Sequence, residues 1–303
     1  MNLDLQIDSV APDEQATGEY TQATQRIKFL QSQEPPDLLA SGRTQFMTHG
    51  YRVERAALLF HGYTNAPQQF RALGQRLFAR GYNVYVPRAP HHGLPDPLTT
   101  AHARLTADEL KQAAAQAFSI AQGLGEQVSV VGISMGGLMT GWLAQEHAEV
   151  ERAMLIAPAF GFRAIPAALT PLVREAAARL PNLFRWWDPT QKGNGDGPKH
   201  AYQRYSTRSL AQLLCLSRDV QLAAARSAPA ARSVMVVTNA NDEAVDNAVA
   251  AKVVAAWRRA GATHIHTHEF NASDQLVHDL IDPDQPKQRV DYVYQVLIDL
   301  LEK

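Results

Sequence analysis

The chain has 303 residues, and its 29 Lys plus Arg against 30 Asp plus Glu leave a formal charge of −1. This near-neutral balance gives no electrostatic footprint for nucleic acid or for an anionic membrane, and no apolar run approaches the ~18 residues that span a bilayer. The single cysteine, Cys215, rules out an intrachain disulfide. The near-neutral charge leads us to expect neutral, small or apolar substrates. Because the first residues lack the pattern of a signal peptide, we expect a cytoplasmic protein.

Residues 1–43 are expected to form an N-terminal extension ahead of the main body. The stretch up to residue 18 is polar, and we expect it to be irregular. A helical pattern then begins at Tyr20 and repeats at Ala23, Ile27 and Leu30. It ends before Pro35, because the residue that precedes a proline is disfavoured in a helix.

From residue 44 onward, short apolar runs alternate with amphipathic helical patterns. The runs cover residues 44–48, 56–60, 83–86, 128–133, 153–157, 233–238 and 265–270, and the helical patterns cover residues 67–78, 106–121, 135–147, 245–259 and 286–301. This alternation predicts an α/β fold with a mostly parallel central sheet flanked by helices. Ligands bind such sheets at the carboxyl ends of the strands, so the residues that follow each run are the first candidates for a site.

The alternation breaks between residues 160 and 228. Helical patterns near residues 165–180 and 210–225 are separated by a loop from Trp186 to Gly197, and the whole stretch is too long for a plain connection. We therefore expect an inserted helical cap over a body built from residues 44–159 and 229–303. The glycine-rich end of the loop lacks the Lys-Ser/Thr ending of a phosphate-binding loop, so we do not expect phosphate binding there.

The motif Gly132-Ile133-Ser134-Met135-Gly136 follows one apolar run directly and opens the next helical pattern. Between a strand and a helix, a G-x-S-x-G motif indicates a nucleophilic serine, because the sharp turn holds the serine hydroxyl exposed over the sheet. The Met135 amide then points the same way, at a helix N-terminus that favours developing negative charge. Ser134 is therefore the candidate nucleophile.

A serine nucleophile needs a base and an orienting acid, and in this setting they follow in the order serine, acid, histidine. His278 is the only histidine after the last apolar run, which makes it the candidate base. Asp242 stands early in the loop after residues 233–238 and is the favoured acid. Asp246 remains an alternative, although it suits the first turn of the following helix equally well.

The other histidines have simpler interpretations. His264, His266 and His268 alternate along one strand, which indicates a polar sheet face or, as an alternative, a metal site. His91 and His92 are expected in a loop or in the wall of the pocket. His61 is expected to be a structural hydrogen-bonding residue, and the Tyr63 amide, two positions later, is well placed as a second donor to a developing oxyanion.

Taken together, these segments resemble the α/β-hydrolase superfamily, and among its members bacterial carboxylesterases and monoacylglycerol-lipase-like esterases. The matching residues are Leu59-Phe60-His61-Gly62-Tyr63-Thr64, Gly81-Tyr82-Asn83-Val84, Pro90-His91-His92-Gly93, Gly132-Ile133-Ser134-Met135-Gly136-Gly137 and the pair Asp242 and His278. The resemblance covers roughly residues 45–303. It implies an acyl-enzyme ester at Ser134, oxyanion donors from Tyr63 and Met135, and a cap over the pocket.

We expect a carboxylic ester hydrolase that needs no metal or organic cofactor and takes small-molecule esters with short to medium acyl chains. The wall for the acyl chain is expected from aromatic residues of the insertion, namely Phe160, Phe162, Trp186, Trp187, Tyr202 and Tyr205. Alternatives within the same fold are a lipase of the monoacylglycerol type, a polyester hydrolase, a thioesterase, a C–C bond hydrolase and a prolyl-type aminopeptidase. A non-enzymatic binding protein is disfavoured by the complete set of serine, acid and histidine.

Overall fold

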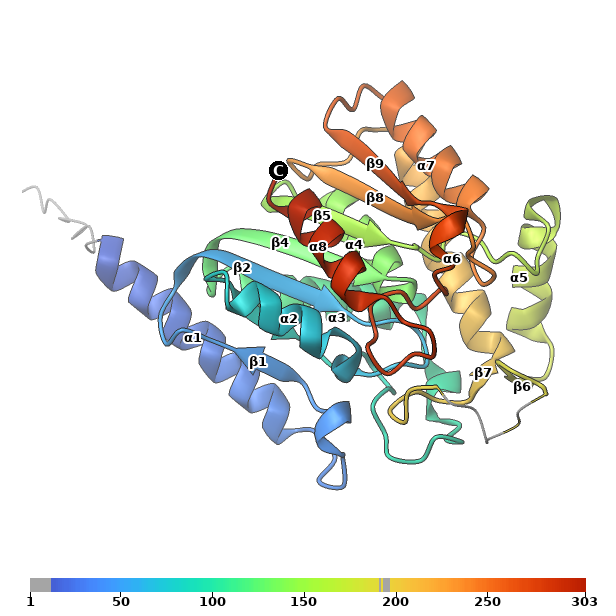
Figure 1. Ribbon diagram of the computed structural model, residues 1–303, viewed down its shortest axis with the longest axis horizontal. Coiled ribbons are helices and arrows are strands. Elements are labelled where there is room, and N and C mark those ends of the chain that lie inside the picture. The colour runs from blue at the N-terminus through green and yellow to red at the C-terminus, as the bar shows by residue number, and fades with distance from the viewer. Residues whose placement is uncertain (1–11, 191, 193–196) are drawn as a thin grey trace, which may run out of the picture.

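The computed structural model describes residues 12–190, 192 and 197–303, and its centre is a twisted seven-stranded sheet (Figure 1). The strand order is β1-β3-β2-β4-β5-β8-β9, with β1 antiparallel to β3 and every other neighbouring pair parallel. The strands are β1 (Gln45–Met47), β2 (Val53–Phe60), β3 (Asn83–Val86), β4 (Gly125–Ile133), β5 (Val150–Ile156), β8 (Val234–Asn239) and β9 (Ile265–Phe270). The mostly parallel α/β sheet expected from the sequence is confirmed.

The apolar runs became strands because helices cover both faces of the sheet. On one face lie α2 (Arg71–Phe78) and α8 (Val290–Leu301), and on the other α3 (Ala107–Ala121), α4 (Met135–Glu146), α6 (Thr207–Ala224) and α7 (Asn247–Arg259) pack in a row (Figure 1). The ends of the central strands are in register, with Phe60 opposite Gly132 and Gly132 opposite Leu155. The loops after β2, β4 and β5 therefore start at one edge of the sheet.

Local signals set the helix ends. Thr106 caps α3 through a capping box with Glu109, in which each side chain binds the other residue's backbone amide. Short 3-10 turns complete the connections at Ala40–Gly42, Pro67–Phe70, Ala101–Arg104, Ala167–Leu169 and Ala272–Asp274.

The first helix, α1 (Pro12–Ser32), begins earlier than the sequence pattern indicated. The expectation that the chain is irregular up to residue 18 is wrong for residues 12–18, and residues 1–11 lie outside the described part. Ala23 and Ile27 bury their side chains in the core beside α3, and this anchored segment continues as helix toward the N-terminus. Tertiary packing thus extends a helix whose polar first turns carry no periodic signal of their own.

The segment between β5 and β8 holds two helices and a hairpin. Helix α5 (Thr170–Arg179) packs on α6, and β6 (Phe184–Trp186) pairs antiparallel with β7 (Arg204–Ser206). The two helices match the expected patterns, whereas the hairpin was not expected. Most of the glycine-rich stretch for which phosphate binding was discounted falls at positions 193–196, outside the described residues. No helix within the described ranges is both long and apolar enough to cross a membrane.

Candidate active site

Ser134 occupies the corner between β4 and α4 in a strained backbone conformation, with φ of 55° and ψ of −112°. The strain is sustained by close packing around the motif, because a Cβ on Gly136 would lie 1.9 Å from the Phe60 carbonyl oxygen. A Cβ on Gly132 would lie 2.1 Å from the oxygen of Gly136. Only glycines allow the helix to begin this close to the ends of β4 and β2, so the motif fixes the serine at the carboxyl edge of the sheet.

His278 and Asp242 meet on loops that follow β9 and β8. The Nδ1 atom of His278 lies 2.7 Å from Oδ2 of Asp242, and Oδ1 of Asp242 accepts hydrogen bonds from the Ala244 and Val245 amides, each at 2.9 Å. Burial alone would raise the pKa of Asp242, but the ring of His278 and the two amides outweigh burial and hold this pKa below its ordinary value. The acid is therefore ionised and oriented toward the ring.

Burial alone would lower the pKa of His278, because it disfavours the charged imidazolium. The carboxylates of Asp242 and Asp279 outweigh that effect and raise the pKa of His278 above its ordinary value. With Nδ1 engaged by Asp242, the Nε2 atom remains to take a proton from a reacting group.

The alternative acid, Asp246, has another place in the structure. Its Oδ1 accepts the Ala248 amide at 2.9 Å and caps the N-terminus of α7. The ring of His278 is thus paired with Asp242, and Asp246 is the N-cap residue of α7.

Ser134 and His278 line one cavity of about 660 Å³ at the carboxyl edge of the sheet. Four of the aromatic residues expected in the acyl wall also line it, namely Phe162, Trp186, Trp187 and Tyr202. The remaining apolar lining comes chiefly from Ile133, Leu210, Leu213, Val245 and Val277. Ordinary drug-sized ligands occupy pockets of this volume, so the cavity has room for a substrate beside the serine.

Two of the expected wall residues lie elsewhere. Phe160 is buried in the core, where its ring meets the edge of Trp257, and the hydroxyl of Ser217 binds its carbonyl. Tyr205 stands on β7 and packs its ring against Trp187, with 4.6 Å between the ring centroids. Neither residue lines the cavity. Phe160 enters the core directly after β5, and the Tyr205 ring is engaged by Trp187.

Tyr63 belongs to a tight turn after β2, closed by the Asn65 amide donating to the Gly62 carbonyl at 3.2 Å. The Gly62 amide donates to Oε1 of Gln69 at 2.7 Å, which leaves the neighbouring Tyr63 amide as the candidate donor to a ligand. A Cβ placed on Gly62 would lie 3.7 Å from the Cβ of Ser134, so the turn passes directly beside the serine. Met135 is the first residue of α4 and is fully buried. Its amide, in the first turn, has no partner within the helix.

A model described as the alpha/beta hydrolase family matches residues 57–291 of this chain. The chain belongs to the alpha/beta hydrolase family. The match spans both the segment with Tyr63 and Ser134 and the segment with Asp242 and His278, so the fold assignment and the candidate site rest on the same part of the chain.

Individual relatives of this hydrolase include lipolytic enzymes. It is 30% identical over 165 residues to a thermostable monoacylglycerol lipase from Bacillus sp. (strain H-257), a match that covers 52% of this chain and 59% of the relative. The matched segment thus spans less than two thirds of that relative's length.

Among solved structures, one from a description of the metagenome-derived lipolytic enzymes LipS and LipT superposes with a TM-score of 0.66 at 17% identity, covering 88% of this chain and 99% of that chain. A monoacylglycerol lipase from Paleococcus ferrophilus gives 0.63 at 16% identity, covering 85% and 97%. At such identities the superpositions show the shared fold.

The other histidines of the hydrolase occupy structural positions. Nε2 of His61 accepts the Ala89 amide and Nδ1 binds the Gly62 carbonyl, while burial lowers the pKa of His61 to about 4 and keeps the ring neutral. His91 binds Glu109 and His92 is buried against the Pro90 carbonyl, and neither lines the cavity. His266 and His268 stand on the outer strand β9, and His264 directly precedes that strand. The part of the chain that the structure describes holds no cluster of three His, Cys, Asp or Glu residues able to bind a metal.

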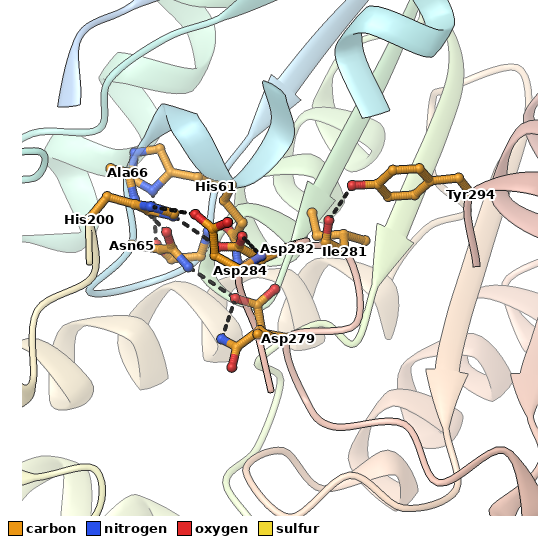
Figure 2. Close-up of polar contacts among 12 residues, drawn as sticks. His61, Asn65, Ala66, His200, Asp279, Ile281, Asp282, Asp284 and Tyr294 are labelled. Carbon is orange, nitrogen blue, oxygen red and sulfur yellow. Dashed lines mark hydrogen bonds and ion pairs between the residues drawn. The ribbon is translucent and has the colours of Figure 1, made fainter. Parts of the chain in front are cut away.

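Sequence reasoning missed a group of polar residues behind His278. Asp279 accepts hydrogen bonds from Asn65 and Gln285, and His200 binds Asp282 at 2.9 Å in a buried pair (Figure 2). Asp279 and Gln285 also line the cavity. The one available signal was the position of Asp279 directly after the candidate base.

Proposed function

We propose that this hydrolase cleaves carboxylic esters with Ser134 as nucleophile, His278 as general base and Asp242 as the orienting acid. The observation that carries the proposal is the arrangement of the three side chains. Ser134 stands on a strained strand-to-helix corner and shares a cavity with His278, and the far side of the His278 ring is held by a buried, ionised carboxylate.

In this mechanism, Nε2 of His278 accepts the Ser134 hydroxyl proton while Oγ forms a bond to the ester carbonyl carbon. The tetrahedral intermediate collapses as the imidazolium gives its proton to the alcohol oxygen, the C–O bond breaks, and an acyl-enzyme remains. Water then gives a proton to His278 and attacks the acyl carbon, and the proton returns to Ser134 as the acid leaves.

The oxyanion of each intermediate lies between the Tyr63 and Met135 amides. Two features support this assignment: the neighbouring Gly62 amide is already engaged by Gln69, and the Met135 amide opens helix α4, where negative charge is favoured. No metal or organic cofactor takes part in these steps.

The substrates we propose are small-molecule esters with short to medium acyl chains, held against the apolar lining contributed by Phe162, Trp187, Leu210 and Leu213. In this proposal residues 160–228 act as a cap over the body of residues 44–159 and 229–303, with residues 1–43 as an extension. A lipase acting on monoacylglycerols is the second candidate. It is favoured by the 30% identity to the Bacillus lipase over half of this chain.

The test is turnover of p-nitrophenyl esters of increasing acyl length by the wild-type protein and by Ser134→Ala. We expect measurable hydrolysis by the wild type, greatest for short to medium chains, and loss of nearly all turnover in the variant. Monoacylglycerols in the same series separate the two candidates. Wild-type turnover rates in Ser134→Ala would end the proposal.

A further inference from the structure

The turn that carries Tyr63 and the loop that carries His278 are joined by one carboxylate. Oδ2 of Asp279, the residue after His278, accepts a hydrogen bond from Nδ2 of Asn65 at 3.1 Å (Figure 2). Asn65 is the last residue of the turn that begins at Gly62. The candidate oxyanion donor, Tyr63, is two residues from Asn65, and the candidate base, His278, is one residue from Asp279. The contact therefore links the segments that carry the two.

Other contacts hold the start and the middle of the turn. The Thr64 carbonyl accepts the Tyr202 amide at 2.6 Å, and Oγ1 of Thr64 accepts Nε1 of Trp187 at 2.9 Å. At its start Gln69 holds the Gly62 amide, and at its middle Thr64 has a positive φ of 63°, a conformation that a β-branched residue adopts only under constraint. The Asn65 side chain is otherwise engaged only through Oδ1, which accepts the Ala66 amide. Loss of the Asp279 contact would remove the link between the Asn65 end of this strained turn and the His278 loop.

Asp279 is itself fixed by its surroundings. Oδ2 also accepts Nε2 of Gln285 at 3.0 Å, so two amide groups from different segments point at one oxygen. Burial, followed by the carboxylate of Asp282, raises the pKa of Asp279 to about 6. Burying an ionisable carboxyl group beside another carboxylate costs free energy. A carboxyl group found there in spite of that cost points to a function beyond packing.

We propose that Asp279 is a positioning residue that holds the Gly62–Asn65 turn and the His278 loop in one frame, so that oxyanion donor and base face the same reacting carbonyl. This inference rests on the proposed ester hydrolysis. Asp279 lines the cavity, and its proposed effect on the reaction is exerted through Asn65 and His278.

The charged and titratable groups around Asp279 come from several elements. On its own loop are His278, Asp282 and Asp284. From other elements, His200 pairs with Asp282 and Asp284, Asp242 after β8 pairs with His278, and Tyr294 of α8 is close enough for the Asp279 charge to raise its pKa. Lys199 lines the same cavity. Among these, His278 is the group whose pKa the Asp279 charge raises and whose protonation state the reaction uses.

The experiment compares Asp279→Ala, Asn65→Ala and the double variant with wild type on one p-nitrophenyl ester, and keeps Asp279→Asn, whose amide oxygen can still accept from Asn65, for the pH profile. Removing an oxyanion donor outright costs about 10²–10³ in kcat, so a displaced donor should cost about tenfold to a hundredfold, with KM changed by less than about threefold. The two single losses should not multiply in the double variant, because both changes break one contact. Asp284→Asn, with a carboxyl that is 56% exposed on the same loop, is the matched control and should keep kcat within about twofold.

A pH profile adds a readout that a merely structural effect would not move. With the Asp279 charge gone, the pKa of His278 falls, so the acid limb of kcat/KM should shift to lower pH in Asp279→Asn but not in Asn65→Ala. The proposal is overturned if both single variants keep the wild-type kcat, or if their kcat losses multiply in the double variant. It is also overturned if the acid limb of kcat/KM does not move in Asp279→Asn. If the Asp279 variants do not fold, Asn65→Ala alone decides through kcat. Absence of ester hydrolysis by the wild type is a different result, which removes the proposed function itself.

Discussion

Nδ1 of His278 and Oδ2 of Asp242 lie 2.7 Å apart, although 36 positions separate the two residues in the chain. The contact exists because β8 and β9 are neighbours in the parallel sheet and both end at the same edge, where their loops meet. In the proposed mechanism this contact leaves Nε2 of the ring for proton transfer and stabilises the imidazolium that forms during the reaction.

The first prediction concerns the identity of the acid. Asp242→Asn should lower kcat by about 10⁴, because the amide favours the wrong tautomer of His278. Asp246→Asn should keep kcat, since its carboxylate only caps α7, and Asp246→Ala should lower the free energy of unfolding by about 1 kcal/mol through loss of the cap. Steady-state kinetics and urea denaturation measure the two effects, and a severe kcat loss confined to Asp246 variants would reverse the assignment.

The second prediction concerns pH. The base works only when neutral, and the carboxylates beside His278 raise its pKa above the ordinary value. The acid limb of kcat/KM should therefore lie at a higher pH than the ordinary histidine pKa, with activity lost as pH falls through it. A pH–rate profile measures this, and an acid limb well below the ordinary histidine value contradicts the pairing.

The third prediction concerns stability and Asp279. Its pKa of about 6 in the folded protein exceeds the ordinary value of 3.8, so the folded state binds this proton more tightly. The resulting contribution to stability is complete below the ordinary pKa and is lost as pH rises through about 6. In Asp279→Asn that dependence should be absent, which denaturant unfolding at a series of pH values between about 4 and 7 can measure. Parallel stability curves for the two proteins would contradict the raised pKa.

The fourth prediction concerns the pair between His200 and Asp282, whose side chains are only 4% and 1% exposed. His200→Ala should lower the free energy of unfolding by about 3 kcal/mol, because it leaves a buried carboxylate without its partner. His266→Ala, on an exposed part of β9, is the matched control and should change stability by less than about 0.5 kcal/mol. Equal stabilities of the two variants would show that the pair contributes nothing.

Much of this site follows from local signals in the sequence. The glycines around Ser134 predict a sharp turn between a strand and a helix. A histidine in the loop after the last strand is predicted to lie at the same edge of the sheet. Both arguments need only the order of elements along the chain. Only the structure shows that His278 is paired with Asp242 while Asp246 caps a helix, because an acid early in a loop and an acid at a helix N-cap look alike in sequence.

Other features depended on contacts that no local pattern reports. Asn65 and Asp279 are 214 positions apart, and each is an ordinary polar residue in its own segment. The hairpin of β6 and β7 escaped notice because each strand has three residues, too few to show alternation. Phe160 was expected in the pocket as an aromatic residue of the insertion, yet the chain turns into the core at that point.

The central claim, that Ser134 forms a covalent acyl-enzyme with the help of His278, is tested most directly by trapping. The wild-type protein and His278→Ala are each mixed with a p-nitrophenyl ester, quenched in acid within milliseconds and analysed by peptide mass mapping. We expect the wild type to carry one acyl group on the peptide with Ser134 and His278→Ala to carry none in the same time. An acyl group on any other residue, or equally rapid acylation of His278→Ala, would contradict it.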